Sequence, residues 1–363
     1  MYIDQKLKRI LSKFGRLIRY FRQTSGSLTP GGGGKTAVIT LSSNILNKDM
    51  GRYSFIICQL LKFSGFEVVL EVTRDFFSSN APYKKMLLDQ GFTLLRNSKE
   101  MKNTVVLYGG RNKKNTIHLN YGIELMNDKI DAYYLPYTLH PRFYQTYLRQ
   151  ADFEIYRNLE RSARILFAGN FERALYSKSI LKEKFPGTIS RVEVLDHIDV
   201  NYADHPAVLY STTKEHLYGL FDGEDARNKF IVSQARTPDA DWLFILGKAD
   251  FYLCLPGVRM PWSHNAFEAM AVGTIPIIQY NALFYPPLEH LKNCITFDSY
   301  GSLDEAIRCA LEMSPEALAL MRKAVIQYFD TYLATECTVG RIESFYNSGD
   351  DSMHVALPFL ELN

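Results

Sequence analysis

Residue types suited to binding an anionic ligand cluster between two apolar runs in residues 250–280. They are Gly257, Arg259, Ser263, His264, Asn265 and Glu268. The runs at 251–255 and 275–279 predict buried strands, and the stretch after Ser263 predicts a short helix that Gly273 ends. Free N–H groups at a helix start bind anions, and Arg259 can neutralise phosphate charge. The segment therefore predicts a site for a phosphate-bearing ligand.

A second turn of the same kind follows the apolar run at 164–168. It contains Gly169, Asn170 and Arg173, and it leads into a predicted helix. In an open parallel sheet, ligands bind beyond the carboxyl ends of the strands, so both turns are expected to face one crevice. A helix cap beside a surface arginine is the alternative for this turn. For Glu268 the alternative is a solvated carboxylate, although its apolar neighbours favour burial.

The elements that must position these turns repeat as strand, helix and strand. Apolar runs at 36–41 and 66–72 flank a helical pattern at 53–64, which predicts a βαβ unit in a parallel sheet. Residues 164–168 start a second series, with a further strand predicted at 192–195. Two such series in one chain indicate two domains.

We therefore predict an α/β fold with two Rossmann-like, doubly wound domains that face a central cleft. Residues 36–155 form the first domain, which would hold an acceptor, and residues 156–335 form the second. The tail at 336–363 could pack back on the first domain.

The first 23 residues predict an amphipathic helix. Its apolar residues recur at three- and four-residue steps, and its other face carries seven basic side chains against Asp4 alone. Such a helix can lie on an anionic membrane surface, and a helix packed on the protein's own core is the alternative. The glycine-rich linker at 24–35 lacks the spacing of a phosphate-binding loop. A peripheral contact with a membrane, through residues 1–22, is the prediction.

Composition narrows the class of protein. The chain has 363 residues, 22% charged side chains and a formal net charge of +3, which suits a two-domain globular protein. Its basic excess is confined to the first 22 residues, so no nucleic-acid partner is expected. Its five cysteines show no Cys-x-x-Cys pair and no zinc spacing, which favours a reducing compartment. We expect a cytoplasmic protein on the inner face of the membrane.

Two tandem domains with the clearest site late in the second resemble the GT-B glycosyltransferases. Residues 250–280 also resemble the C-terminal signature of exostosin-like glycosyltransferases, an apolar strand followed by Cys-Pro-x-Gly, Ser, Glu-Ala, Gly and Ile-Pro. The matching residues are Cys254, Pro256, Gly257, Ser263, Glu268, Ala269, Gly273, Ile275 and Pro276. Leu255 interrupts the pattern, and His264 and Asn265 stand where an arginine is common.

The resemblance implies a nucleotide-sugar donor, with its diphosphate at the turn 257–265 and its ribose hydroxyls on Glu268. It implies no cofactor and no metal for the chemistry. Asp239 and Asp241 form an Asp-x-Asp pair, which holds metal in the other large glycosyltransferase fold. Here the pair follows Pro238, so we expect it to complement a helix dipole.

Stereochemistry and the general base are the next expectations. Many retaining members of this fold class carry two glutamates eight positions apart, and Met260 stands at that position before Glu268. This favours inversion, which requires a general base on the acceptor hydroxyl. The candidates lie in the first domain and are His140, Asp49 and Asp131. A structural histidine is the alternative for His140, and a surface loop is the alternative for the segment that contains Asp49.

The expected activity is hexosyl transfer from a nucleotide-sugar, with a UDP-sugar as the expected donor, to a glycan or lipid-linked saccharide. The reaction would serve the synthesis of a surface polysaccharide or glycoconjugate. A nucleotide-sugar epimerase or hydrolase of the same architecture is one alternative. A non-catalytic, membrane-docked glycan-binding protein is another.

Overall fold

The computed structural model describes most of the chain. The described residues are Gly15, Ile18, 20–24, 34–41, 50–79, 81–96, 104–109, 113–122, 132–135, 138–169, 172–176, 180–258 and 260–358. Asp49, Asp131, Asn170 and Arg259 lie outside them, as does most of the N-terminal helix.

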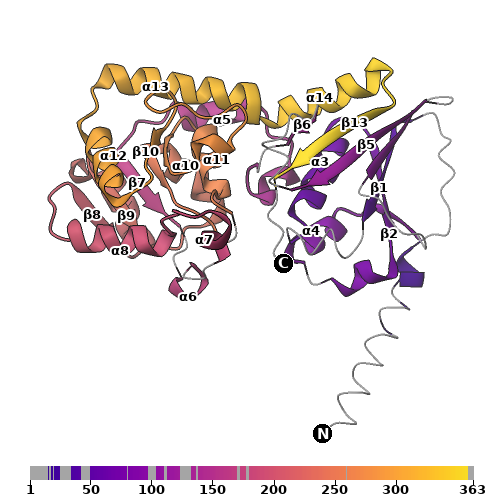
Figure 1. The fold of residues 1–363 in the computed structure, drawn as a ribbon, viewed down its shortest axis with the longest axis horizontal. Helices are drawn as coiled ribbons and strands as arrows, with labels where there is room; N and C mark the ends of the chain where they lie inside the picture. Colours follow the sequence, from indigo (N-terminus) through magenta and orange to yellow (C-terminus); the bar gives the residue numbers. More distant parts are fainter. Residues whose placement is uncertain are drawn as a thin grey trace, which may run out of the picture.

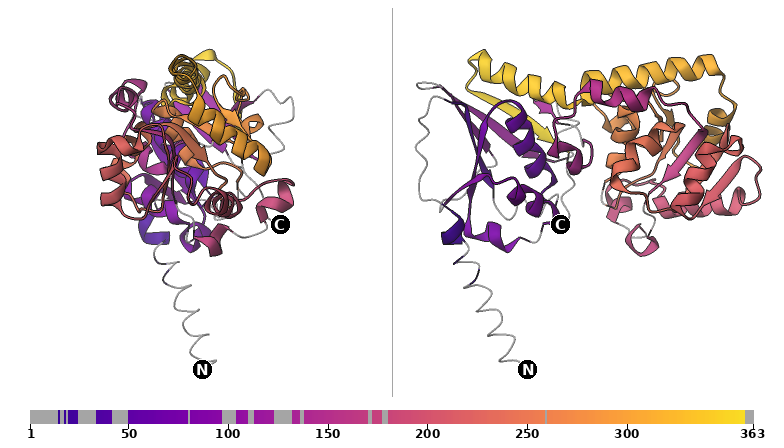
Figure 2. Two further views of the ribbon diagram at one scale, coloured as in Figure 1. Left: turned by 90° about the vertical axis from the view of Figure 1, so that its left-hand side faces the viewer. Right: turned by 180° about the vertical axis from the view of Figure 1, so that it is seen from behind.

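Two mixed α/β domains lie side by side (Figure 1). The first sheet has the strand order β3 (Thr93–Arg96), β2 (Glu67–Val72), β1 (Thr36–Leu41), β4 (Thr104–Gly109), β5 (Lys113–Tyr121), β13 (Ser352–Leu357) and β6 (Tyr133–Tyr134). Its helices are α3 (Arg52–Phe63), η1 (Arg74–Ser78), α4 (Pro82–Asp89), η3 (Pro141–Gln145) and α14 (Thr335–Ser348). Helices α3 and α4 lie between this sheet and the second domain (Figures 1 and 2).

The second sheet has the order β12 (Ile295–Thr296), β11 (Ile275–Ile278), β10 (Ala249–Cys254), β7 (Ala163–Ala168), β9 (Phe230–Ser233) and β8 (Val208–Ser211), and all its ladders are parallel. The helices that precede β10 are α5 (Gln150–Arg157), α6 (Arg173–Tyr176), α7 (Ile180–Lys184), α8 (Arg191–Asn201), α9 (Lys214–Asp222), η4 (Glu224–Ala226), η5 (Asp239–Asp241) and α10 (Trp242–Gly247). They are followed by α11 (His264–Ala271), η6 (Asn281–Leu283), α12 (Tyr300–Glu312), α13 (Pro315–Tyr328) and the π-helical turn η7 (Phe329–Leu333).

The predicted α/β class and its parallel-dominated sheets are confirmed, with two local differences. Strand β4 forms an antiparallel hairpin with β5, and it also pairs antiparallel with β1. The strand predicted at 192–195 is wrong, since these residues lie in the first turns of α8. A capping box between Ser190 and Glu193 starts this helix, and both side chains bond to each other's backbone N–H.

The chain returns to the first domain at its C-terminal end. Helices α13 and α14 cross from one domain to the other along one edge of the molecule (Figures 1 and 2). Strand β13 then pairs in parallel with β5 and with β6. The Tyr53 hydroxyl donates to the Pro358 carbonyl at 3.0 Å and ties this end to α3. The first domain therefore contains residues from both ends of the sequence.

Replacing Val355 with aspartate is expected to lower the free energy of unfolding by about 3 kcal/mol, because an unpaired carboxylate would be buried in the core. Val355 is 6% exposed and pairs with Leu119 and Tyr133. Ser352→Asp on the exposed end of the same strand is the matched control. Urea unfolding measures both, and equal losses would contradict a structural role for β13.

The N-terminal segment contacts the first domain where the structure describes it. The ring of Tyr20 lies 5.9 Å from that of Phe77 in η1. Arg96 donates to the hydroxyl of Thr24 at 2.9 Å. Nowhere in the described part of the chain is a helix both long and apolar enough to cross a membrane.

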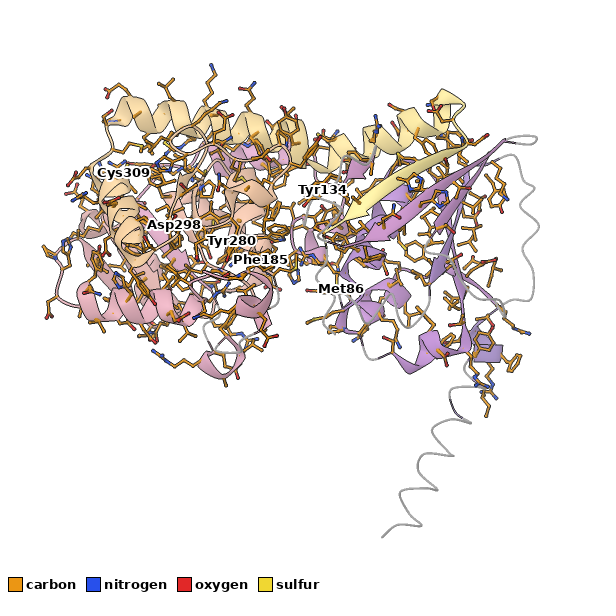
Figure 3. The ribbon with its side chains drawn as sticks, in the orientation of Figure 1. Met86, Tyr134, Phe185, Tyr280, Asp298 and Cys309 are labelled. Atoms are coloured by element: carbon orange, nitrogen blue, oxygen red, sulfur yellow. The ribbon has the colours of Figure 1, made fainter. Side chains whose placement is uncertain are left out.

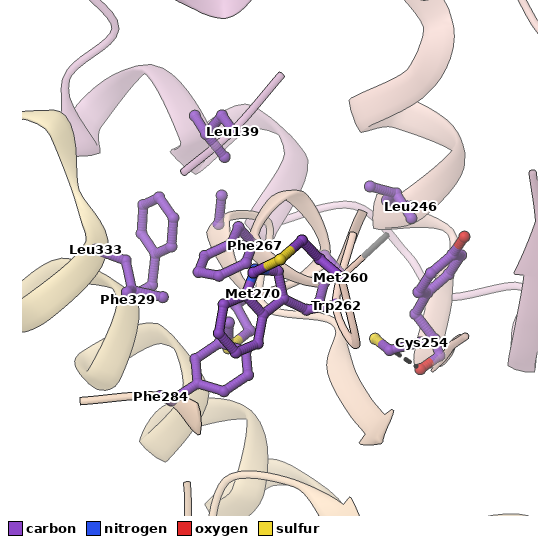
Figure 4. Packing of buried hydrophobic residues seen from close by; sticks show 14 of the residues in the cluster. Leu139, Leu246, Cys254, Met260, Trp262, Phe267, Met270, Phe284, Phe329 and Leu333 are labelled. Atoms are coloured by element: carbon purple, nitrogen blue, oxygen red, sulfur yellow. Dashed lines mark hydrogen bonds between the residues drawn. The ribbon is translucent and has the colours of Figure 1, made fainter. Parts of the chain in front are cut away.

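Helix α11 is packed on nearly every side. Figure 4 shows Phe267 and Met270 of this helix among Phe284, Phe329 and Leu333, and all of these side chains are buried. The rings of Phe267 and Phe284 stack at 5.1 Å. Across the junction, the Tyr134 hydroxyl donates to the Leu283 carbonyl at 3.4 Å. Figure 3 labels Tyr134 where the two domains meet. This packing holds α11 within the second domain, and the Tyr134–Leu283 hydrogen bond joins that domain to the first.

Candidate active site

A cleft of about 980 Å³ lies between the domains. Its lining residues in the first domain are Met50, Arg52, Tyr83, His140 and Arg142. Those in the second domain include Gly169, Glu172, Tyr176, Arg191, Gln234, Arg236, Asp239, Trp242, Gly257, Met260, Trp262, Ser263, His264 and Asn265. Six residues predicted from the sequence therefore meet here, namely His140, Gly169, Gly257, Ser263, His264 and Asn265.

The turn between β10 and α11 is compact. The Gly257 N–H donates to the Met260 carbonyl at 2.9 Å, and a Cβ at position 257 would lie 3.1 Å from the Trp262 carbonyl. Only glycine fits so close an approach without a shift of the backbone. At the helix start, Asn265 donates to the Tyr252 hydroxyl at 3.0 Å, and Tyr252 donates to Ala168 at the end of β7. The two polar turns are thus joined at the carboxyl ends of neighbouring strands.

Arg191 is a cleft residue that the sequence reasoning missed. It is buried at the start of α8, and it donates to the carbonyls of Pro256 at 3.1 Å and Leu255 at 3.2 Å. It also lies over the ring of Tyr176, with 4.2 Å between the guanidinium carbon and the ring centroid. The capping-box pattern at Ser190 marks a helix start and was the available signal. Arg191 therefore holds the backbone just before Gly257 and adds positive charge to the cleft.

Three further arginines line the cleft. Arg52 of α3 is buried and donates to the carbonyls of Thr138 at 3.0 Å and Leu139 at 2.7 Å. Arg142 forms an ion pair with Asp239 across the junction, and the exposed Arg236 has no polar partner among the described residues. With Arg191, the described residues of the cleft include four arginines against the carboxylates of Glu172 and Asp239. Its net charge is positive, which suits an anionic ligand.

Glu268 lies below the cleft, fully buried, and is not among the lining residues. Its carboxylate accepts three hydrogen bonds, from Trp242 Nε1 at 2.6 Å, from the His140 backbone N–H at 2.8 Å and from His264 Nδ1 at 2.9 Å. The donors belong to α10, to the loop before η3 and to α11. One carboxylate therefore connects the two domains.

The shifts in this cluster follow from burial and charge. Burial by itself would raise the pKa of Glu268, but the charge of His264 and the hydrogen bonds from His264 and His140 lower it to about 2. Burial also lowers the pKa of His140 to about 3, and the neighbouring His264 and arginines add to this effect. At neutral pH, Glu268 is ionised and His140 is neutral.

Stability is expected to fall on acidification, because both shifts make the unfolded chain bind more protons than the folded one. The contribution of Glu268 is present above pH 4.5 and is lost as the pH falls towards 2. The folded state also loses stability from pH 6.5 towards 3, because the unfolded chain binds a proton at His140 while the buried ring stays neutral. His140→Gln should therefore flatten the slope of unfolding free energy between pH 6.5 and 4.5, as measured by urea titrations. Exposed His216→Gln should keep the wild-type slope, and an unchanged slope in His140→Gln would contradict the burial of an uncharged ring.

Both ring nitrogens of His140 have partners. Nδ1 accepts from the Arg142 backbone N–H at 3.2 Å, so the proton of the neutral ring is on Nε2. Nε2 lies 3.3 Å from the Tyr83 hydroxyl. The ring thus orders the loop before η3 while it lines the cleft.

The remaining predicted residues lie elsewhere. Arg173 is exposed, forms an ion pair with Asp196 and does not line the cleft. In the Asp-x-Asp pair, Asp239 meets Arg142, whereas Asp241 accepts from Lys214 at 3.0 Å and from the Tyr218 hydroxyl at 2.7 Å. Among the described residues, no group of three or more His, Cys, Asp or Glu side chains could hold a metal ion.

Comparison with known proteins finds no matching family model and no matching curated protein. Among solved structures, a glycosyltransferase from Rickettsia africae matches with a TM-score of 0.40 at 8% identity, over 86% of this chain and 97% of that one. HepE of Anabaena, in complex with UDP and glucose, matches with a TM-score of 0.36 at 12% identity, over 90% and 98%. MurG of Acinetobacter baumannii matches with a TM-score of 0.34 at 12% identity, over 85% and 99%. Scores this low identify no family for this chain.

Proposed function

We propose that this protein is a glycosyltransferase that moves a hexose from a nucleotide-sugar, with UDP-sugar as the expected donor, to a glycan or lipid-linked saccharide. The observation that carries the proposal is the positively charged cleft at the carboxyl ends of β7 and β10. Its volume of about 980 Å³ is at the upper end for small-molecule sites, which suits a nucleotide-sugar together with an acceptor. The acceptor would enter from the first domain, and the product would be a surface polysaccharide or glycoconjugate.

The diphosphate of the donor would lie at the turn 257–265. The N-terminal N–H groups of α11 and the arginines Arg191 and Arg236 would supply donors and positive charge there, and the sequence adds Arg259 in the same turn. Gly169, Asn170, Ser263 and Asn265 would contact the rest of the nucleotide. Arg173 has no place in this arrangement, because it is directed to Asp196. Transfer would be inverting and independent of metal and cofactor, with a protein side chain as the base.

UDP binding tests the donor. UDP at concentrations well above its Kd is expected to stabilise the wild-type protein by roughly 1–3 kcal/mol in thermal unfolding. Arg236→Ala, which removes a cleft cation, should reduce this response, whereas Arg308→Ala on the exposed surface of α12 should preserve it. No response to UDP or to any nucleotide in a panel would rule out the proposal. Sugar release that needs no acceptor would instead indicate a hydrolase.

The membrane contact of residues 1–22 is part of the same proposal. Its support is the sequence pattern of an apolar stripe beside seven basic residues. Flotation with vesicles containing anionic lipid should separate the full chain from a chain that starts after residue 22. Equal flotation of the two chains would contradict a membrane contact through residues 1–22.

A further inference from the structure

His264 is held by a buried carboxylate at one side of its ring. Its Nδ1 lies 2.9 Å from Oε2 of Glu268, one helical turn further along α11. The same carboxylate is held by Trp242 Nε1 at 2.6 Å and by the His140 backbone N–H at 2.8 Å. Because the carboxylate is anchored from three elements, the ring of His264 has a defined orientation.

The tautomer of His264 follows from this contact. Ionised Glu268 can only accept a hydrogen bond, so Nδ1 carries the proton of the neutral ring. The lone pair is then on Nε2, at the edge of the ring that points away from Glu268. His264 lines the cleft, and its side chain is 31% exposed. No described residue forms a hydrogen bond with Nε2.

The neighbouring His140 differs in this respect. Its ring lies 4.9 Å from that of His264 at 76°, but its lone pair on Nδ1 already accepts the Arg142 N–H. Burial also holds its pKa at about 3. His140 is therefore a poor proton acceptor at neutral pH, although it lines the same cleft.

We propose that His264 is the general base of the transfer reaction and that Glu268 is its positioning residue. This inference rests on the proposed function. Nε2 of His264 accepts the proton of the acceptor hydroxyl, and that oxygen forms a bond to the anomeric carbon from the face opposite the leaving group. The bond between the anomeric carbon and the diphosphate oxygen breaks, and its electron pair leaves with the nucleoside diphosphate. The arrangement of a carboxylate, an imidazole and a reacting hydroxyl is suited to proton transfer at neutral pH.

The surrounding charges act in opposite directions on the imidazolium that forms. Glu268, on the same helix, stabilises it by charge and by a hydrogen bond. The opposing charges come from the first domain and are those of Arg52 in α3 and Arg142 in η3, because the neighbouring His140 is neutral. A bound diphosphate would offset the charge of these arginines.

His264→Asn tests the proposal in the full-length protein, with His197→Asn as the matched control. His197 is also held by a carboxylate, that of Asp304 at 2.8 Å, but lies on α8 outside the cleft. Turnover is followed as UDP release, with a panel of UDP-hexoses and alkyl glycosides. We expect kcat to fall by about 10²–10⁴-fold in His264→Asn and to stay at the wild-type value in His197→Asn. The Kd for UDP, from calorimetry, should stay within about threefold in His197→Asn and should change much less than kcat in His264→Asn, which keeps the backbone N–H groups of the turn.

The pH profile gives an independent measurement. The wild-type kcat should decrease at acidic pH, and this limb should vanish in His264→Asn. In Glu268→Gln the limb should move to lower pH, because the imidazolium loses its counter-charge; a purely structural role would leave it in place. Full turnover in His264→Asn, or a loss of UDP affinity that accounts for its lower activity, would overturn the proposal. If the wild-type protein neither binds UDP nor releases it from any donor, the proposed function itself fails, and the role of His264 fails with it.

Discussion

Replacing Glu268 with alanine is expected to lower the free energy of unfolding by about 3–5 kcal/mol at neutral pH. The substitution leaves Trp242 Nε1 and the His140 N–H without an acceptor in a buried position, and it removes the acceptor of the His264 hydrogen bond. Each unpaired buried donor costs about 1–3 kcal/mol. Because the three donors come from both domains, the loss should also loosen the junction. Denaturant unfolding, monitored by tryptophan fluorescence, measures the effect.

Glu305→Ala is the matched control for this prediction. Glu305 is an exposed glutamate on α12 of the same domain, and its removal should change stability by less than about 0.5 kcal/mol. A loss below about 1 kcal/mol in Glu268→Ala would mean that the carboxylate is not the connection between the domains that the geometry indicates.

Arg191→Lys is expected to weaken UDP binding by about 10–100-fold, which corresponds to about 1.4–2.7 kcal/mol. A single ammonium cannot reproduce the planar fork that bonds both Leu255 and Pro256 while it lies over the Tyr176 ring. The charge is kept, so the experiment separates geometry from electrostatics. Calorimetry with UDP gives the affinity.

The exposed Arg227, which pairs with Glu160, provides the control for this change as Arg227→Lys. Its UDP affinity should equal that of the wild-type protein. Unaltered UDP binding in Arg191→Lys would show that the turn at 257 keeps its shape without the guanidinium, and that charge alone supports the ligand.

Strands were predictable wherever the pattern was local. The apolar runs at 36–41 and 164–168 correspond to β1 and β7, because a continuous apolar run of this length between polar turns is typical of a strand buried on both faces. Strand pairing was not predictable in the same way. The antiparallel course of β4 and the insertion of β13 between β5 and β6 depend on contacts between distant parts of the chain.

The candidate site shows the same division. The residues from Gly257 to Asn265 are consecutive in the sequence. His264 and Glu268 are four positions apart in a helix, and this step places two side chains on one face. Sequence by itself therefore determined which residues form the polar turn and that they meet at the start of α11. Only the tertiary structure decided that Arg191 supports this turn and that Trp242 and His140 hold Glu268 in the interior. Those partners are up to 128 positions away in sequence, and their contacts arise from the packing of two domains, which no local pattern encodes.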